Sequence, residues 1–163
     1  MYFILFICFV ISQRLIELII AKKNEKWVRS HGAVEYGQNH YPFIILLHTM
    51  FIISMVIEYF WRSGIFTSIL LWVFFVLEIL KVWIISSLGK YWNIKILRVP
   101  RSPFVKKGPY KLFKHPNYFI VICEIIIIPM VFNLYVTAIV FTILNTIMLA
   151  VRIREEEKVW AAI

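Results

Sequence analysis

The sequence predicts an all-α membrane protein that crosses the bilayer about five times and forms a single domain. Three observations lead to this prediction. The 163-residue chain is 61% hydrophobic, its mean hydropathy is +0.80, and its apolar residues are gathered in long uninterrupted runs. One water-soluble core of this length cannot bury so much apolar surface, so a bilayer must cover the remainder.

The apolar runs define the predicted helices, and each is close to the length that a membrane span requires. They cover residues 1–21, 42–61, 65–88, 116–132 and 134–151. The first run has neither a charged leading region nor a small-residue cleavage site, so we expect a retained span rather than a removable signal. No repeat or linker divides the chain, and we expect residues 1–163 to form one integral-membrane domain.

Basic residues are distributed unevenly between the runs. Of the 18 Lys and Arg residues, four fall within residues 22–40, eight fall within 89–117 and three follow residue 151, whereas only Arg62 lies in a loop at the other end of the spans. This asymmetry predicts an N-terminus outside and a C-terminus in the cytoplasm, in a multi-pass protein of the cell membrane. The net charge of +9 then suits anionic lipid headgroups rather than nucleic acid.

Asn133 separates the last two runs almost alone, which predicts a tight antiparallel hairpin. His115 precedes this residue by 18 positions and Arg152 follows it by 19. At a helical rise of about 1.5 Å per residue, both lie roughly 27–29 Å from the turn. The stretch HPNY (115–118) and the tail VRIREEEK (151–158) should therefore face each other at the cytoplasmic end of the hairpin.

The tail carries its own pairing signal. Arg152 and Glu156 are four residues apart, so on a continuing helix they share a face and can pair. Three consecutive carboxylates (155–157) oppose the dipole of a helix C-terminus, and the basic segment 89–117 can supply cationic partners. The composition of this tail fits two interpretations equally well. It is either part of a functional site or the mixed-charge end of a span at the membrane interface.

Three motifs occur in order on the two sides of this hairpin: GPY (108–110), KHPNY (114–118) and RIREEE (152–157). Together they resemble the isoprenylcysteine carboxyl methyltransferase family, whose C-terminal half shares GPY or GVY, RHP-x-Y, an apolar hairpin and R-I-x-x-E-E. The segment LGKYW (88–92) also resembles the approach to this region. The resemblance covers about residues 89–158 and implies a membrane enzyme that transfers a methyl group from S-adenosylmethionine, with these residues as its cofactor-binding and catalytic region.

The resemblance also implies roles for individual residues. Arg152 matches the position that holds the acceptor, and Arg152 and Glu156 are the implied catalytic residues. The implied cofactor contacts are Ser102, Pro103, Phe104, Val105, Tyr110, His115, Pro116, Asn117, Tyr118 and Glu156. This set fits a positively charged sulfonium, which suits aromatic faces and a carboxylate. Pro116 can occupy the first turn of a helix, whose free N–H groups suit the carboxylate of the methionyl moiety.

Departures from the family pattern fall on the acceptor side. Lys114 stands where most members have arginine, and Ile120 stands where a glycine usually follows the tyrosine by two residues. Glu124 is also outside the prenylcysteine pattern. The short chain and the stretch HPNYFIVICE (115–124) resemble the small bacterial members, which methylate long-chain polyketides such as alkylpyrones or alkylresorcinols. The expected acceptor is such a polyketide or a prenylcysteine carboxylate.

Ionisable residues inside the runs are functional candidates by default. Glu124 is either a substrate-binding residue of the acceptor pocket or an interhelical hydrogen-bonding residue. Arg14 and Glu17 are three apart, as are Glu78 and Lys81, so each pair is expected to form within its own helix.

The other polar residues support no sharper expectation. His48 is expected to pack or to hydrogen-bond, and Glu58 to lie near external water without a special role. Trp92 falls at a run end, where aromatic rings commonly form an interfacial belt. The polar segment 22–42 is compatible with a lid, which the sequence leaves open, and no metal-ligand spacing is visible.

Two other function classes stay open beside an S-adenosylmethionine-dependent O-methyltransferase acting on a lipid-like acceptor. One is a nicotinamide-dependent membrane reductase of the sterol type, whose C-terminal region is also similar to this family. The other is a non-enzymatic small membrane transporter or assembly protein, in which charged pairs line a polar pathway. The oligomeric state has no signal in the sequence.

Overall fold

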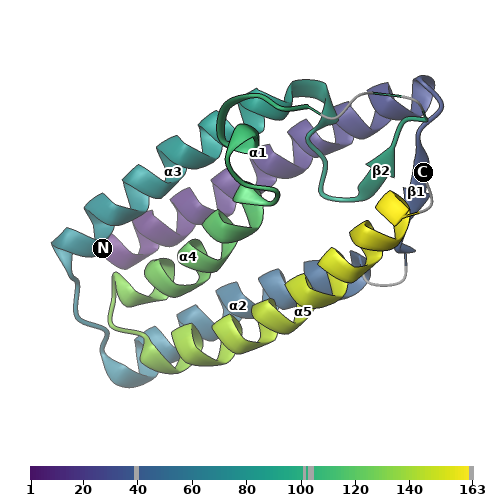
Figure 1. Ribbon diagram of the computed structural model, residues 1–163. Coiled ribbons are helices and arrows are strands. Elements are labelled where there is room, and N and C mark those ends of the chain that lie inside the picture. The colour runs from purple at the N-terminus through teal and green to yellow at the C-terminus, as the bar shows by residue number, and fades with distance from the viewer. Residues whose placement is uncertain (39–40, 101, 103–104, 162–163) are drawn as a thin grey trace.

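Five α-helices account for most of the chain in the computed structural model, which describes residues 1–38, 41–100, 102 and 105–161. The helices are α1 (Tyr2–Ser30), α2 (Tyr41–Arg62), α3 (Ser68–Leu88), α4 (Pro116–Met130) and α5 (Tyr135–Ala161) (Figure 1). Two 3-10 turns, η2 (Gly89–Tyr91) and η3 (Gly108–Lys111), and two short strands, β1 (Val34–Tyr36) and β2 (Ile96–Arg98), complete the described elements. The chain is therefore an all-helical polytopic membrane protein.

The helices differ in the length that they offer to a membrane. Of the described helices, α1, α2, α3 and α5 are long and apolar enough to cross one. The 15 residues of α4 rise only about 22 Å, less than the roughly 30 Å of a hydrocarbon core. Each predicted run thus contains a helix, but helix length supports a full crossing for four of them.

Each of the three basic segments places described residues at one end of the bundle (Figure 1). The strands β1 and β2 and the end of α5 are at this end, and the start of α1, the α2–α3 connection and the α4–α5 turn are at the other. We call the first the loop end. That it faces the cytoplasm stays a prediction from the positive charge.

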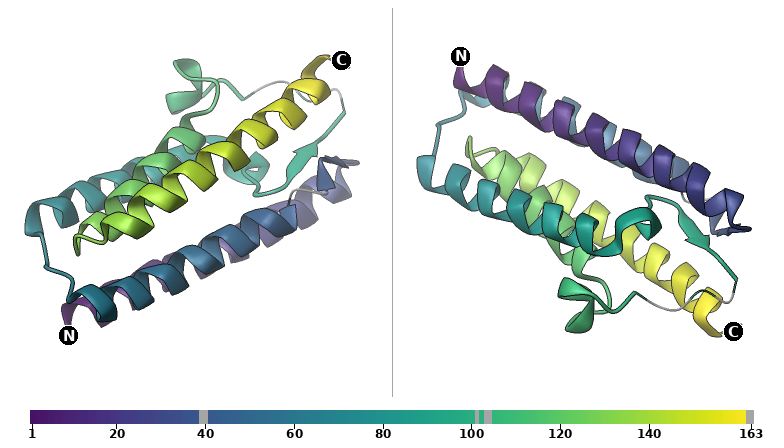
Figure 2. Two further views of the ribbon diagram at one scale, coloured as in Figure 1. Left: turned by 90° about the horizontal axis from the view of Figure 1, so that it is seen from below. Right: turned by 90° about the horizontal axis from the view of Figure 1, so that it is seen from above.

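The helices α4 and α5 form an antiparallel hairpin, which both views of Figure 2 show side by side. Asn133 adopts a positive φ of 55° in the turn, a conformation that asparagine tolerates better than most residues. The Leu134 N–H closes the turn by donating to the Pro129 carbonyl over 3.1 Å. This tight reversal fixes the relative depth of residues along the two helices.

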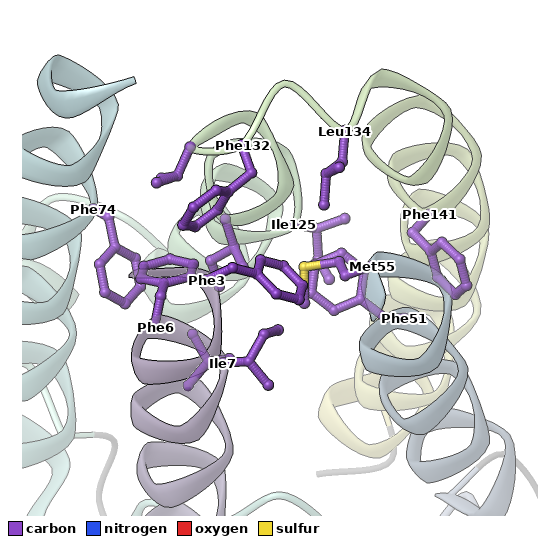
Figure 3. Packing of buried hydrophobic residues seen from close by; sticks show 13 residues of the cluster. Phe3, Phe6, Ile7, Phe51, Met55, Phe74, Ile125, Phe132, Leu134 and Phe141 are labelled. Carbon is purple, nitrogen blue, oxygen red and sulfur yellow. The ribbon is translucent and has the colours of Figure 1, made fainter. Parts of the chain in front are cut away.

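A cluster of aromatic and aliphatic side chains packs the end of the bundle opposite the loop end (Figure 3). Phe3 stacks on Tyr59 with 3.7 Å between ring centroids, and Phe6 meets Phe74 at 5.1 Å. Edge contacts such as that between Phe6 and Phe74 add to the free energy of burying the rings. The helices are thereby held firmly at this end.

Glu58 caps a helix, contrary to the expectation that it has no special role. The residue is 6% exposed, and its carboxylate accepts hydrogen bonds from the backbone N–H groups of Val136 (3.0 Å) and Thr137 (2.7 Å). Free N–H groups and the positive dipole end of a helix both favour a carboxylate at this position. Glu58 therefore ties α2 to the start of α5.

A buried ionic network joins α1, α3 and α4. The Glu124 carboxylate is fully buried and lies 2.8 Å from Arg14 and 2.7 Å from Lys81. Glu17 completes the network, 3.0 Å from Arg14 and 2.6 Å from Lys81. The predicted Arg14–Glu17 pair is thus confirmed, whereas the prediction that Lys81 pairs with Glu78 is wrong, because Lys81 contacts carboxylates on two other helices.

At the loop end, the last turns of α1 and the strand β1 contact the segment that follows α3. The strands β1 and β2 pair antiparallel, with Glu35 opposite Leu97. Asn24 donates to the carbonyls of Gly89 (3.1 Å) and Trp92 (2.8 Å), and Lys95 lies 2.8 Å from Glu25. The hydrogen bond to Glu25 raises the pKa of Lys95. These contacts anchor the start of the long loop before α4.

Candidate active site

Tyr118 is the centre of a hydrogen-bonded group between α4 and α5. Arg152 Nε donates to the Tyr118 hydroxyl over 2.7 Å, and this hydroxyl in turn donates to Glu156 Oε1. Arg152 Nε also lies 3.4 Å from Glu156 Oε1, as expected for residues one helical turn apart. The geometry brings the HPNY stretch and the charged tail together at one depth.

His115 completes this group from the position before α4. Its ring stacks on that of Tyr118, with centroids 5.1 Å apart and planes inclined by 5°, and its Nδ1 lies 3.4 Å from Glu156 Oε2. Burial lowers the pKa of His115 below its usual value, against the opposing effect of Glu156. The imidazole is therefore neutral at pH 7.

The start of α4 has no side-chain cap in the described part of the chain. Pro116 is its first residue, as the HP motif predicts, and His115 before it makes no side-chain capping hydrogen bond. The side chain of Pro116 itself is buried. Pro116 therefore begins the helix but offers no polar contact to a ligand.

The carboxylates of the tail all have cationic neighbours. Glu157 pairs with Lys114 at 3.5 Å, and Glu155 pairs with Lys158 at 2.5 Å. The loop before α4 thus supplies the expected partner for one glutamate, and the tail supplies it for another. Of the three, Glu156 is the one drawn into the Tyr118 group.

The GPY turn is fitted closely against α3. Gly108 has a positive φ of 51°, and a Cβ there would collide with the Ser87 hydroxyl. Tyr110 packs against a buried cluster that includes Leu77 and Ile120. Burial, aided by the charge of Glu156, raises the pKa of Tyr110, so its hydroxyl stays protonated.

A cavity of about 470 Å³, here the first cavity, opens between the segment 88–118 and α5. Most of the predicted cofactor and catalytic residues line it. They are Ser102, Val105, Tyr110, His115, Asn117, Tyr118, Arg152 and Glu156. Pro103 and Phe104 lie outside the described residues. The predicted set is therefore a spatial group wherever the structure describes it, except for Pro116, which is buried beside it.

A second cavity of about 290 Å³ lies among α1, α2, α4 and α5. Its walls are mainly aliphatic, with Leu15 of α1, Ile44 of α2 and Leu149 of α5 as examples. The residues that it shares with the first cavity are Trp92, Asn93, Asn117, Tyr118 and Arg152. The Tyr118 group thus lies where the first cavity meets a second cavity with a more apolar lining.

Polar side chains occur on the wall of the second cavity away from Tyr118. Besides Thr49, they are Arg14, Glu17, His48, Lys81 and Asn145. Glu124 does not line this cavity. It contacts Arg14 and Lys81, whose side chains do. Sequence reasoning had singled out Glu124 and assigned no site role to the other five.

Trp92 differs from its sequence interpretation. It is 4% exposed and lines both cavities, so the expectation of an interfacial belt residue is wrong. The sequence feature that could have indicated a site role for Trp92 is its position in LGKYW (88–92), which resembles the segment that precedes the conserved motifs of the family.

Arg152 keeps hydrogen-bonding capacity toward the cavities. Its side chain is 11% exposed, and in the described part of the chain only its Nε has a hydrogen-bond partner. The two terminal nitrogens of the guanidinium are therefore available for a planar anionic group.

The fold and the site together define a polytopic helical membrane protein with a polar site that adjoins an apolar cavity. Residues 68–162 match the model of the isoprenylcysteine carboxyl methyltransferase (ICMT) family. The chain belongs to this family, which is a family of methyltransferases.

Two relatives match almost the whole chain. The uncharacterized protein YpbQ of Bacillus subtilis (strain 168) is 44% identical over 164 residues, which cover 96% of this chain and 95% of the relative. An uncharacterized protein of Haemophilus influenzae (strain ATCC 51907 / DSM 11121 / KW20 / Rd) is 29% identical over 159 residues, with 94% and 91% covered. No solved structure matches the chain.

Proposed function

We propose that the protein is an S-adenosylmethionine-dependent O-methyltransferase of the cell membrane that acts on a lipid-like acceptor. The observation that carries this proposal is the position of the Arg152–Tyr118–Glu156 group at the junction of the two cavities. The first cavity would take the methyl donor, and the second would take the acceptor.

The lining of the first cavity suits this donor. His115 Nε2 and Asn117 Oδ1 are buried and have no hydrogen-bond partner in the described part of the chain. Unpaired buried polar atoms cost about 1–3 kcal/mol each, so a polar ligand in this cavity relieves that cost. When bound, S-adenosylmethionine supplies an electrophilic methyl group on a positively charged sulfur.

Charge and aromatic faces provide the affinity for that cation. The Glu156 carboxylate attracts it, and the ring of Tyr110 presents a negative face. The neutral state of His115 matters here, because a second positive charge beside Glu156 would compete with the sulfonium. Orientation of the two reactants is the main requirement of methyl transfer, and the packed helix ends supply it.

Arg152 would hold the oxygen that receives the methyl group. Its free terminal nitrogens can stabilise an anionic oxygen and aim it at the first cavity. A carboxylate or an acidic enol arrives deprotonated and needs no base. A phenol must lose a proton, and Glu156 or His115 is within the same hydrogen-bonded group to accept it. Long-chain polyketides such as alkylpyrones and prenylcysteine carboxylates both meet this description.

Glu124 would act as a positioning residue for the acceptor pocket. Through its contacts with Arg14 (2.8 Å) and Lys81 (2.7 Å) it holds two lining side chains in place. The charges within this network compensate one another, which keeps the pocket suited to a mostly apolar ligand.

Depth in the membrane suits the two reactants. Residues 135–152 of α5 rise about 26 Å, so Arg152 lies near the edge of a hydrocarbon core of about 30 Å. A water-soluble donor can enter from the loop end, and a lipid-dissolved acceptor can enter sideways between the helices.

Calorimetric titration of the detergent-solubilised protein with S-adenosylmethionine, S-adenosylhomocysteine and NADPH tests this proposal. The first two should bind and the dinucleotide should not. A labelled-methyl assay with alkylpyrones, prenylcysteines and phospholipids then identifies the acceptor class. Binding of NADPH alone would favour the reductase, and transfer only to a phospholipid amine would overturn the oxygen assignment.

Neighbouring glutamates offer a matched control. Glu156→Gln should weaken S-adenosylmethionine binding about tenfold, because it removes the carboxylate of the Tyr118 group. Glu157→Gln changes an exposed carboxylate on the same turn and should leave binding unchanged. Equal effects of the two substitutions would contradict the proposed site.

A further inference from the structure

The second cavity contains hydrogen-bonding groups that the methyl transfer does not use. The antiparallel helices α2 and α5 supply these groups. Contacts nearer the end of the bundle opposite the loop end fix the register of the two helices. Ser54 Oγ lies 2.8 Å from Thr137 Oγ1, and the rings of Phe51 and Phe141 are 5.5 Å apart. One further turn toward the loop end, three residues back on α2 and four forward on α5, brings His48 opposite Asn145.

The side-chain amide of Asn145 is the first of these groups. The residue is 2% exposed and lines the second cavity, and its Nδ2 has no hydrogen-bond partner within the described chain. A buried amide without a partner destabilises the folded state by about 1–3 kcal/mol. A ligand atom that accepts a hydrogen bond from Nδ2 would remove this cost.

His48 offers the complementary group. Its Nδ1 lies 2.9 Å from the carbonyl of Ile44, which can only accept, so Nδ1 carries the proton. A neutral imidazole in this tautomer presents Nε2 as an acceptor. Because His48 also lines the second cavity, a donor and an acceptor face the same space.

The charges nearby are already balanced. Arg14 and Lys81 each contact Glu124 and Glu17, at distances from 2.6 to 3.0 Å. An additional charged group would find no counter-charge in this network, so a neutral ligand group is favoured. A hydroxyl satisfies both partners, because it can donate to His48 Nε2 and accept from Asn145 Nδ2. A carbonyl or an ether can only accept.

We propose that His48 and Asn145 bind a hydroxyl group of the acceptor, distinct from the oxygen that is methylated. This inference rests on the proposed function and narrows its substrate class to amphipathic acceptors that carry a hydroxyl group in addition to the methylated oxygen. Asn145 and Arg152 are separated by about 10 Å of helix rise, and the Arg152 side chain leans toward the N-terminus of α5. The two oxygens should therefore lie within roughly 10 Å of each other, as they do on one ring.

A pair of probes tests this: a resorcinol with a long alkyl chain, and the phenol of equal chain length that lacks one hydroxyl. Their affinities for the solubilised protein can be measured by tryptophan fluorescence, since Trp92 lines the same cavity. The wild-type protein should prefer the resorcinol about tenfold, the effect of one well-placed buried hydrogen-bonding group. His48→Phe and Asn145→Leu should each reduce this preference severalfold.

Thr49→Val is the matched control. Thr49 also lines the cavity, but its hydroxyl is already bonded to the Ile45 carbonyl at 2.9 Å, so the preference should persist. Equal affinity of the wild-type protein for both probes would overturn the inference, as would a preference that survives both His48→Phe and Asn145→Leu. The two proposals can fail separately. If the protein prefers the resorcinol but does not bind S-adenosylhomocysteine, only the methyltransferase proposal is contradicted. If it transfers methyl groups but binds both probes equally, only the proposed hydroxyl site is contradicted.

Discussion

Arg152 donates a hydrogen bond from Nε to the hydroxyl of Tyr118 across 2.7 Å, although 34 residues separate them in sequence. This contact joins α5 to the first turn of α4. Through the same hydroxyl, Arg152 is connected to Glu156 on its own helix. The contact therefore fixes three of the proposed site residues relative to one another.

Removing that hydroxyl should weaken the site without disturbing the fold. Tyr118→Phe keeps the ring between His115 and Arg152 but deletes two hydrogen bonds to charged groups, each worth about 1.5–3 kcal/mol when buried. Because Arg152 and Glu156 can then pair directly, we expect a net loss of about tenfold in S-adenosylhomocysteine affinity, measured by calorimetry. Tyr135→Phe removes a hydroxyl bonded to Asn133 at the opposite end and should change nothing. Equal losses in the two variants would show that the effect is not local.

Glu124→Gln should destabilise the protein strongly. The substitution leaves Arg14 and Lys81 sharing only Glu17, and breaking a buried ionic network typically costs about 3–5 kcal/mol. Equilibrium unfolding in mixed micelles measures the change. Glu157→Gln removes an exposed pair with Lys114 and should cost less than about 1 kcal/mol. Wild-type stability in Glu124→Gln would mean that the network contributes no net stabilisation.

Gly108→Ala should perturb the GPY turn more than its backbone conformation alone requires. Both Gly108 and Gly32 have positive φ, 51° and 80°, so alanine at either costs about 1–2 kcal/mol. Only at Gly108 does the new Cβ meet another group, the Ser87 hydroxyl, whereas nothing lies within 4 Å at Gly32. Thermal unfolding and cofactor binding should both be worse for Gly108→Ala than for Gly32→Ala. Ser87→Gly on the Gly108→Ala background should recover part of the difference.

Binding of the methyl donor should depend on the protonation of His115. Burial lowers the pKa of this residue, so it is neutral at pH 7 and becomes charged only as the pH falls through that lowered value. The new charge competes with a sulfonium for Glu156. Affinity for S-adenosylmethionine should therefore decrease severalfold at low pH, and affinity for the uncharged sulfide S-adenosylhomocysteine should decrease less. Calorimetric titration across pH measures this ratio, which should be flat in His115→Gln and unaltered in His31→Gln.

Local spacing in the sequence predicts part of this structure well. The single residue between two apolar runs predicts the hairpin at Asn133, and counting along both helices places His115 and Arg152 at one depth. The pairing of Arg152 with Glu156 follows from helical periodicity in the same way. Each of these inferences depends only on distance along a helix axis.

Relationships that depend on how helices rotate against one another were not predictable. Lys81 is three residues from Glu78, yet it turns toward Glu17 and Glu124 on neighbouring helices. Glu58 caps α5 because α2 happens to end beside it. Sequence spacing gives the height of a side chain, whereas packing decides which neighbour it meets, and this is why His48 and Asn145 had no signal as a pair.

The shortness of α4 has a consequence for the surrounding lipids. Where a helix of about 22 Å meets a bilayer about 30 Å thick, the annular lipids beside it must bend or thin to cover its start. The resulting dimple would lie directly over His115 and Tyr118. An amphiphile that diffuses in that leaflet would thus move closer to the aqueous boundary before it reached the protein. The local deformation of the membrane would then help to bring the acceptor to the site.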